Sequence, residues 1–158
     1  MIVIMGVSGC GKTTIGKLLS TEIGIPFYDA DHFHPKENVM KMKSNLSLTD
    51  EDRHPWLNIL ASKIEEWEDN GGAILACSAL KESYRKLLSS KVENVIWVYL
   101  YGSFELIKSR LEQRQNHYMK SDLLKSQFNT LEEPNYGLHI NTAKPEEDIM
   151  KQILLNLR

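Results

Sequence analysis

The sequence predicts an α/β fold, in which one parallel sheet lies between two layers of helices. Two observations predict this three-layer α/β/α arrangement. Short apolar runs alternate with segments of helical periodicity along the whole chain, and such alternation is typical of a parallel sheet covered by helices. A length of 158 residues and a hydrophobic content of 42% suit one compact core. Because no repeat or linker interrupts the pattern, we expect a single domain over residues 1–158.

Five apolar runs are predicted as strands. They are short and nearly continuous in apolar character, as expected of strands buried on both faces. They cover residues 2–5, 26–29, 73–77, 95–100 and 138–140. Between them, periodicity and capping residues predict helices over residues 14–23, 36–43, 79–88 (capped by Ser78) and 122–128, and further helices that begin after Thr49, Ser103 and Pro145.

The bulk composition limits the class of partner. Lysine and arginine number 19 against 21 acidic residues, so the formal net charge is −2 and no general attraction to nucleic acid or to a membrane is expected. No apolar run reaches the length of a membrane span, and the N-terminus lacks the pattern of a secretory signal. Cys10 and Cys77 are too few for a disulfide framework. We therefore expect a cytoplasmic protein, in which a local cluster of lysine and arginine holds any anionic substrate.

A glycine-rich stretch directly after the first predicted strand carries the strongest functional signal. It matches the pattern G-x-x-x-x-G-K-[ST], here called the phosphate loop, and reads Gly6-Val7-Ser8-Gly9-Cys10-Gly11-Lys12-Thr13. Glycines allow a sharp turn that directs several N–H groups at one point, and the following helix adds the positive end of its dipole. In such a loop Lys12 reaches the β- and γ-phosphates, and the hydroxyl of Thr13 binds Mg²⁺. The stretch predicts nucleotide binding, but it does not identify what is phosphorylated.

Two aspartates follow the second predicted strand. Asp29 and Asp31 are two residues apart, so in extended backbone their side chains share a face. They lie at the strand end where open α/β sheets bind ligands. One carboxylate could then face Mg²⁺ and the other a hydroxyl of the substrate. A polar turn in which an aspartate caps a helix explains the same residues equally well.

Cationic residues are predicted near the same edge of the sheet. Lys81 and Arg85 are four residues apart on the helix predicted after the third strand, so they share a helical face that suits a carboxylate. Arg53 lies near the start of the helix after Thr49. For Arg53 alone, a solvated or salt-bridged surface arginine is the simpler interpretation.

A helix interrupted by a polar stretch predicts a mobile lid. Arg110 and Arg114 lie four residues apart on the helix after the fourth strand, away from its apolar stripe. Residues 115–120 then break the pattern before the short helix 122–128. A lid of this kind closes over a phosphoryl donor, excludes water and brings arginines to the developing charge. Two ordinary surface helices are the alternative, in which His117 is a solvated loop residue.

Together these motifs resemble the small phosphate-loop gluconokinases over nearly the whole chain. The phosphate loop is shared by many families, but the blocks after the second and third strands are specific. Besides that loop, the matching residues are Asp29-Ala30-Asp31-His32-Phe33-His34-Pro35, Asn38, Lys41, Met42, Leu48, Asp50, Asp52-Arg53, Pro55-Trp56-Leu57, Cys77-Ser78-Ala79-Leu80-Lys81, Tyr84-Arg85, Arg110-Leu111, Arg114, His117, Leu124, Gln127-Phe128, Leu131-Glu132 and Pro134.

The resemblance implies a reaction and a set of site residues. Gluconokinases transfer the γ-phosphoryl group of ATP to the 6-hydroxyl of D-gluconate. The resemblance further implies a P-loop kinase fold with a helical lid at about residues 114–134, the cofactors ATP and Mg²⁺, and a homodimer. The implied residues are Gly6, Ser8, Gly9, Cys10, Gly11, Lys12, Thr13 and Thr14 for ATP; Thr13 and, through water, Asp29 for Mg²⁺; Asp31, His34, Arg53, Lys81, Arg85, His117 and Gln127 for gluconate; and Lys12, Asp31, Arg110 and Arg114 for catalysis. Because the transition state of phosphoryl transfer is loose, Asp31 is expected to aim the hydroxyl rather than to remove its proton early.

The chain departs from the family pattern at two turns. Asn45 and Ser47 stand where the family usually has glycine and proline, and Asn116 and Tyr118 replace glycine and phenylalanine beside the lid histidine. Asparagine adopts positive φ more readily than most residues, so these changes affect loop geometry and not the reaction class.

A shikimate kinase is the nearest alternative. It would carry a glycine triplet after the third strand, where this chain has Ser78-Ala79-Leu80-Lys81. A nucleotide kinase would need a second base-binding site, which no motif indicates. A GTPase-like switch would need the motif N-K-x-D, which residues 141–144 do not supply. In such folds, residues 141–145 lie beside the phosphate loop and could flank an adenine base.

Overall fold

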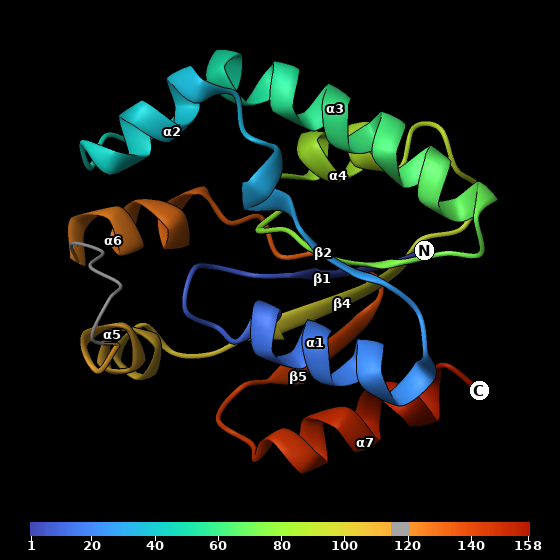
Figure 1. Ribbon diagram of the computed structural model, residues 1–158. Helices are drawn as coiled ribbons and strands as arrows, with labels where there is room; N and C mark the ends of the chain where they lie inside the picture. The colour runs from blue at the N-terminus through green and yellow to red at the C-terminus, as the bar shows by residue number, and fades with distance from the viewer. Residues whose placement is uncertain (115–120) are drawn as a thin grey trace.

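A parallel sheet of five strands forms the centre of the molecule (Figure 1). The computed structural model describes residues 1–114 and 121–158. The strand order is β2-β3-β1-β4-β5, and every neighbouring pair is parallel. The strands are β1 (Ile2–Met5), β2 (Phe27–Asp29), β3 (Ile74–Ala76), β4 (Ile96–Tyr101) and β5 (Leu138–Asn141). Each boundary lies within one residue of a predicted apolar run, so the predicted parallel α/β architecture is confirmed.

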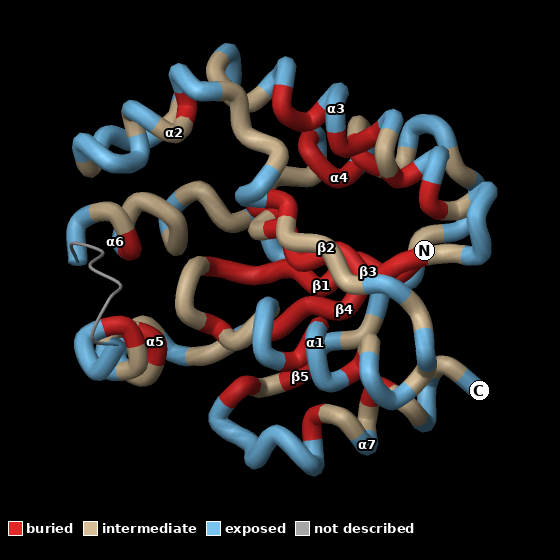
Figure 2. The backbone as a smooth tube through the Cα atoms, in the orientation of Figure 1, coloured by how far each residue is buried: buried red, intermediate tan, exposed pale blue. Residues whose placement is uncertain are grey.

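Helices cover both faces of this sheet, which is buried at its centre (Figures 1 and 2). Their bounds are α1 (Lys12–Ile23), the 3-10 helix η1 (Ala30–Phe33), α2 (Lys36–Lys43), α3 (Asp50–Asp69), α4 (Glu82–Leu88), α5 (Phe104–Glu112), α6 (Ser121–Thr130) and α7 (Glu146–Asn156). Alternate residues of β1 enter different cores, because successive strand side chains point to opposite faces. Val3 packs with residues of α3 and α4, and Ile4 packs with residues of α1, α5 and α7. Within the described ranges, no helix has the length and apolar character that crossing a bilayer requires.

Helix α3 begins where its predicted cap lies. Thr49 Oγ1 accepts a hydrogen bond from the Asp52 amide at 3.1 Å, and Asp52 Oδ2 accepts one from the Thr49 amide at 2.9 Å. This reciprocal pair is a capping box, which satisfies two backbone donors at the helix start. The first turn of α3 is thereby fixed at the edge of the sheet where ligands are expected. The buried residues of α3 are Trp56, Leu57, Leu60, Ala61, Ile64 and Trp67.

Two details of the predicted helices are wrong. Helix α4 begins at Glu82 and not at residue 79, because Ala79 has a φ of +44° and Lys81 is extended with a φ of −105°. Lys81, rather than Ser78, occupies the N-cap position. On α1, the spacing of Ile15, Leu18, Leu19 and Ile23 predicts one apolar face, but Leu18 is 41% exposed. The helix instead turns Gly16 toward the sheet, where a Cβ would lie 2.3 Å from the ring of Phe27.

The turn between α2 and α3 adopts the conformation expected from its asparagine. Asn45 has a φ of +57°, the left-handed conformation that glycine supplies most easily and asparagine tolerates. The Asn45 amide donates to Met42 O at 3.1 Å, and the Leu46 amide donates to Lys41 O at 3.0 Å. Asparagine therefore replaces the family's glycine without opening this turn.

Candidate active site

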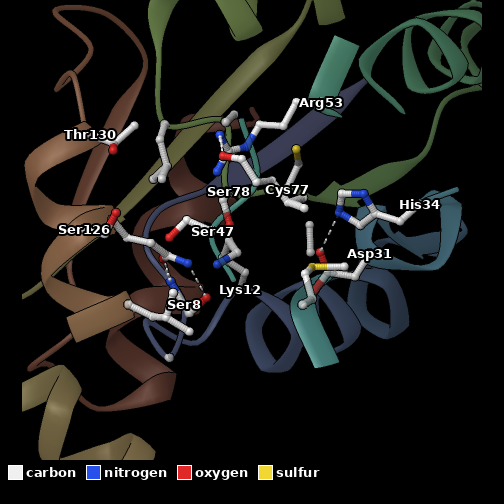
Figure 3. Close-up of a pocket in the computed structure, with 18 of the residues that line it drawn as sticks. Ser8, Lys12, Asp31, His34, Ser47, Arg53, Cys77, Ser78, Ser126 and Thr130 are labelled. Atoms are coloured by element: carbon white, nitrogen blue, oxygen red, sulfur yellow. Dashed lines mark hydrogen bonds and ion pairs between the residues drawn. The ribbon is translucent and has the colours of Figure 1, made fainter. Parts of the chain in front are cut away.

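A cavity of about 530 Å³ opens at the C-terminal edge of the sheet (Figure 3). The phosphate loop and the ends of β2 and β3 line its base, and the α2–α3 turn, the first turns of α3, the β3–α4 turn and α6 contribute its walls. Open α/β sheets bind ligands at this edge. The predicted site residues that line the cavity are Ser8, Gly9, Gly11, Lys12, Thr13, Asp29, Asp31, His34, Arg53, Arg114 and Gln127.

The phosphate loop has the turn that its glycines predict. Gly9 and Gly11 have φ values of +81° and +101°, in the region that favours glycine. A Cβ at Gly9 would also lie 2.7 Å from Leu111 Cγ, so a side chain there would have to displace the side chain of Leu111. Lys12 Nζ donates to the carbonyl oxygens of Gly6 and Val7 at 2.9 Å each. The loop thus combines a tight glycine turn with a fixed cation at a helix N-terminus, which together suit a phosphate.

Asp29 caps the helix that follows it and also contacts the first turn of α1. Its Oδ1 accepts from the Asp31 amide at 3.0 Å, which caps η1. Its Oδ2 accepts from the Thr13 hydroxyl at 3.1 Å. The carboxylate of Asp31 is 77% exposed on the cavity wall, and its Oδ1 lies 3.8 Å from Nε2 of His34 (Figure 3). The start of α1 and the end of β2 therefore present hydroxyl and carboxylate oxygens beside the phosphate loop, and Mg²⁺ prefers oxygen ligands of this kind.

His34 is held neutral against the cavity wall. Its side chain is only 3% exposed and stacks on Trp56 at a ring-centroid distance of 4.1 Å. Burial, assisted by the positive charge of Arg53, lowers the pKa of His34 to about 4. Nδ1 lies 3.2 Å from the side-chain nitrogen of Asn38, which is a donor, so Nδ1 accepts. The proton of the neutral ring is consequently on Nε2, the atom that faces Asp31.

Arg53 reaches the cavity from the first turn of α3. Its Nη1 donates to Leu48 O at 2.7 Å and to the hydroxyl of Tyr84 at 3.3 Å. The guanidinium lies over the Tyr84 ring, 5.5 Å from its centre. The side chain is 22% exposed, so it is half-buried and not the solvated surface arginine of the simpler interpretation. Among the described residues these hydrogen bonds use Nη1 alone. The N–H groups on the other nitrogen atoms of the guanidinium can therefore donate to a ligand.

Lys81 is paired with a neighbouring carboxylate and does not line the cavity. Its Nζ donates to the two oxygens of Asp50 at 3.0 and 3.2 Å. Asp50 also accepts from the hydroxyl of Tyr84 and lies 4.0 Å from Arg53. The hydrogen bonds from Tyr84 and Lys81 lower the pKa of Asp50, and the bond to Asp50 raises the pKa of Lys81. Asp50 therefore carries a negative charge that offsets part of the positive charge of Lys81 and Arg53.

Arg85 does not lie at the cavity, contrary to the prediction that it contacts the substrate. It is 1% exposed and is absent from the cavity lining. Its three nitrogen atoms donate to Glu82, Tyr136 and the carbonyl oxygens of Ala79 and Glu132. The prediction failed because it assumed that Lys81 and Arg85 share a helical face, whereas α4 begins only after Lys81.

Gln127 connects α6 with the phosphate loop. Its Oε1 accepts from the Ser8 amide at 2.7 Å, and its Nε2 donates to Ser8 Oγ at 3.0 Å. Ser126 and Thr130 of the same helix line the cavity (Figure 3). The helix predicted as part of a lid thus lies directly against the phosphate loop.

A smaller cavity of about 210 Å³ adjoins the other side of the phosphate loop. Arg114 lines both cavities, and Arg110 Nη2 donates to Thr142 O at 2.6 Å. The hydroxyl oxygen of Thr142 is buried with no hydrogen-bond partner in the described chain. Residues that line this cavity include Cys10, Gly11, Thr14, Arg110, Arg114, Thr142 and Lys144. His117, the remaining predicted contact, lies outside the described residues.

Sequence reasoning missed two aromatic residues of the large cavity. Trp56 stacks on His34 and donates its Nε1 to Ala30 O at 2.8 Å, and Tyr84 holds Arg53 and Asp50. By composition alone Trp56 is most simply a core residue, and it is 5% exposed. Its spacing of three residues from Arg53 on one helix was a usable signal, since such residues lie on one side of a helix.

Comparison with known proteins places the chain among small-molecule kinases. The family model described as shikimate kinase matches residues 8–158. A probable gluconokinase of Dictyostelium discoideum is 44% identical, and the match covers 100% of this chain and 86% of that protein. The thermoresistant gluconokinase of Escherichia coli (strain K12) is 41% identical, with coverage of 84% and 76%.

Solved structures show the same relationship. The crystal structure of a gluconokinase from Sinorhizobium meliloti 1021 matches with a TM-score of 0.91 at 37% identity, over 99% of this chain and 90% of that chain. A sugar kinase from Janibacter sp. matches with a TM-score of 0.92 at 42% identity, over 99% and 92%. A shikimate kinase from Aquifex aeolicus, at 21% identity and a TM-score of 0.62, shares the fold. The chain is therefore a phosphate-loop kinase that belongs to the gluconokinase family.

Proposed function

We propose that this kinase transfers the γ-phosphoryl group of ATP to the 6-hydroxyl of D-gluconate, with Mg²⁺ bound to the phosphates. One observation carries the proposal: a single cavity joins a phosphate loop, a carboxylate at the end of β2 and a half-buried arginine. A linear sugar acid has a hydroxyl at one end and a carboxylate at the other. The names of the related gluconokinases support the same assignment.

The donor half of the cavity fits a nucleotide with its metal. The glycine turn leaves no room for a side chain at Gly9, and Lys12 stands where it can pair with the β- and γ-phosphates. Thr13 and Asp29 offer the hydroxyl and carboxylate oxygens that would hold Mg²⁺, directly and through water. When bound, Mg²⁺ would neutralise charge on the phosphates. We assign the nucleoside to the smaller cavity, where Thr142 supplies an unpaired buried oxygen.

The acceptor half fits an acidic polyol. In our proposal Asp31 accepts the hydrogen bond of the 6-hydroxyl and aims its oxygen at the γ-phosphorus, and the Nε2–H of neutral His34 donates to an oxygen of the same acceptor. Arg53 pairs with the carboxylate, because its guanidinium is desolvated on one side and keeps donors for a ligand. Lys81 acts through its ion pair with Asp50, which also lies beside Arg53, rather than through a direct contact with the substrate.

Closure of the region around α6 completes the proposed site. Arg114 lines both cavities, so it can reach the phosphates from between donor and acceptor. In our proposal Arg110 also reaches the phosphates, after its hydrogen bond to Thr142 O is replaced by a contact with the nucleotide. Excluding water at this stage prevents transfer of the phosphoryl group to water. We assign the lid to about residues 114–134, with His117 inside it.

An ADP-release assay tests the substrate assignment. The purified protein is given ATP and Mg²⁺ with gluconate, shikimate, other sugar acids or nucleoside monophosphates, each as the single acceptor. We expect rapid release with gluconate and background release with the others. Turnover with shikimate in place of gluconate would overturn the proposal in favour of the function named by the family model.

The resemblance to gluconokinases also leads us to propose a homodimer in the cytoplasm. Both cysteines are free and buried, as suits a reducing compartment. Light scattering of the purified protein at micromolar concentration tests the dimer, with the mass of one chain, 18.2 kDa, as the contrary result.

A further inference from the structure

Arg85 is a buried cation that is fully engaged with the protein itself. Its Nε donates to Glu82 Oε2 at 3.0 Å and to the Tyr136 hydroxyl at 2.9 Å. Nη1 donates to Ala79 O at 2.7 Å, and Nη2 donates to Glu132 O at 2.8 Å. A buried charge that has a paired carboxylate and a hydrogen-bond partner for each of its three nitrogen atoms holds its neighbours in one geometry, because any displacement leaves polar groups unpaired. Arg85 thus joins the β3–α4 turn, α4 and the segment after α6.

Three more hydrogen bonds close the same network. Glu132 Oε2 accepts from the Glu82 amide at 2.8 Å, and the Glu132 amide donates to Leu80 O at 2.8 Å. The Tyr136 hydroxyl donates to Glu82 Oε2 at 2.8 Å. The turn at Leu80 and the chain at Glu132 are 52 residues apart in sequence, yet main-chain and side-chain bonds tie them directly together. The network is therefore a rigid link between two segments that border the cavity.

One end of this link is the turn that lines the acceptor side. Ser78, Ala79 and Leu80 all line the large cavity. Ala79 has a φ of +44°, a conformation that alanine adopts only when its surroundings enforce it. The bond from Arg85 Nη1 to Ala79 O holds the residue in that conformation. The preceding carbonyl, Ser78 O, accepts from the Gly6 amide at 3.3 Å, which ties the turn to the phosphate loop.

The other end of the link is the C-terminal end of α6, here called the base of α6. Helix α6 ends at Thr130, two residues before Glu132, and the Leu131 amide still donates to Gln127 O. Gln127 in turn contacts Ser8 of the phosphate loop through both its side-chain oxygen and its side-chain nitrogen. The position of Glu132 therefore fixes the C-terminal end of α6, the helix that carries Gln127 to the phosphate loop.

We propose that Arg85 is a positioning residue that fixes the acceptor-side turn and the base of α6 as one unit, so that Ser78–Leu80 and Gln127 face each other across the phosphate loop. It acts on the reaction without touching the substrate. The inference rests on the kinase reaction proposed above, but not on gluconate as the acceptor. Its consequence is a division of effects: nucleotide binding depends on the phosphate loop, which β1 and α1 hold, whereas turnover and acceptor affinity depend on Arg85.

Steady-state kinetics of Arg85→Lys and Tyr136→Phe test this division. Tyr136→Phe removes only the hydroxyl that bridges Arg85 and Glu82 and keeps the ring packed on Trp97. Lys86→Ala is the matched control, because Lys86 is the next residue on α4 and is exposed. We expect kcat/KM for the acceptor to fall at least tenfold in Arg85→Lys and severalfold in Tyr136→Phe, with the Kd of a fluorescent ADP analogue within twofold of wild type. Equal losses of acceptor turnover and nucleotide affinity, in step with the folded fraction, would assign Arg85 to folding alone and overturn the proposal.

Chemical rescue and a double-mutant cycle separate positioning from stability. In Arg85→Ala, millimolar guanidinium chloride can refill the cavity and bond Ala79 O and Glu132 O, so kcat should rise toward wild type, whereas methylammonium should restore little. In the cycle, the effects of Arg85→Lys and Gln127→Ala on kcat should be markedly non-additive, although the two side chains share no contact. Lys86→Ala with Gln127→Ala should be additive. Additive effects in the Arg85 cycle would overturn the proposal, and wild-type turnover of another acceptor would overturn only the gluconate assignment.

Discussion

The donor and acceptor sides of the large cavity are built in different ways. The donor side comes from one continuous stretch, the phosphate loop and the start of α1, whose binding groups are mostly backbone amides and one lysine. The acceptor side is assembled from side chains on η1, α3 and the β3–α4 turn. Hydrogen bonds between distant segments, such as those from Arg53 to Tyr84 and from Trp56 to Ala30, hold these side chains in place. The chain therefore fixes its donor site locally and its acceptor site only through tertiary packing. Substitutions should consequently affect the two sides in different kinetic constants.

The largest expected loss follows from removing the lysine of the phosphate loop. Lys12→Ala deletes the ammonium that lies over the phosphate loop. Because removing a single preorganised group that stabilises transition-state charge lowers turnover by about 10²–10³-fold, we expect kcat to fall by about 10³-fold. Lys17→Ala is the matched control, since Lys17 is exposed on the same helix. Turnover near wild type in Lys12→Ala, measured by ADP release, would contradict the assignment of this loop to the donor.

The next loss tests whether Asp31 acts at the acceptor and not at the donor. Asp31→Asn keeps the side-chain shape but removes the charge that accepts and aims the substrate hydroxyl. Positioned groups of this kind contribute about 10²–10⁴-fold, and we expect the low end, because a loose transition state needs little proton removal. The KM for ATP should change less than threefold. Asp69→Asn, at the exposed end of α3, serves as the control. An unchanged kcat would remove Asp31 from the mechanism, and a parallel loss of ATP affinity would place it on the donor side.

The same contrast explains how much the sequence could predict. The sheet, the phosphate loop and the caps at Thr49 and Ser103 were predicted correctly, because each depends on residues that are neighbours in sequence. Asp29 was left open between a cap and a metal contact, and it does cap η1 and meets the Thr13 hydroxyl.

The acceptor side could be predicted only in part. Arg85 was assigned to the substrate because it lies four residues from Lys81, but the positive φ of Ala79 delays the start of α4 and turns Arg85 inward. No local signal reveals that turn, since its geometry depends on Glu132 and Tyr136 far along the chain. Tyr84 and Trp56 were missed for a related reason: large aromatic residues on a helix are ordinary core residues until their polar atoms are placed.

A smaller effect should separate the two cations of the acceptor side. Arg53 keeps donors for a ligand, whereas Lys81 is partly exposed and bound to Asp50. A hydrogen bond to a charged group contributes about 1.5–3 kcal/mol, so Arg53→Ala should raise the KM for gluconate by roughly 10- to 150-fold, with the KM for ATP unchanged. Arg53→Lys should fall between Arg53→Ala and wild type, because lysine lacks the planar fork.

Lys81→Ala should have the weaker effect on the same constant. Its bond to Asp50 is a surface ion pair, which contributes roughly 1 kcal/mol or less. We therefore expect a KM for gluconate within a few-fold of wild type, and Arg158→Ala, exposed at the C-terminus, as the unaffected control. A larger effect from Lys81→Ala than from Arg53→Ala would mean that Lys81 and not Arg53 meets the carboxylate.

The smallest effect concerns stability and tests the neutral state of His34. The pKa of its side chain falls from 6.5 in the unfolded chain to about 4 in the folded protein. Between these values the unfolded state binds a proton that the folded state does not, so stability is present above pH 6.5 and is lost as the pH falls toward 4. We expect the Tm of the wild type to drop by a few degrees more over this range than that of His34→Phe, which keeps the stacking on Trp56 and cannot be protonated. His54→Gln, exposed on α3, should follow the wild type. An equal decrease in Tm over this pH range for wild type and His34→Phe would mean that His34 is not held neutral. Its Nε2–H would then not be a fixed donor beside Asp31, and the acceptor side would depend on Asp31 and Arg53 alone.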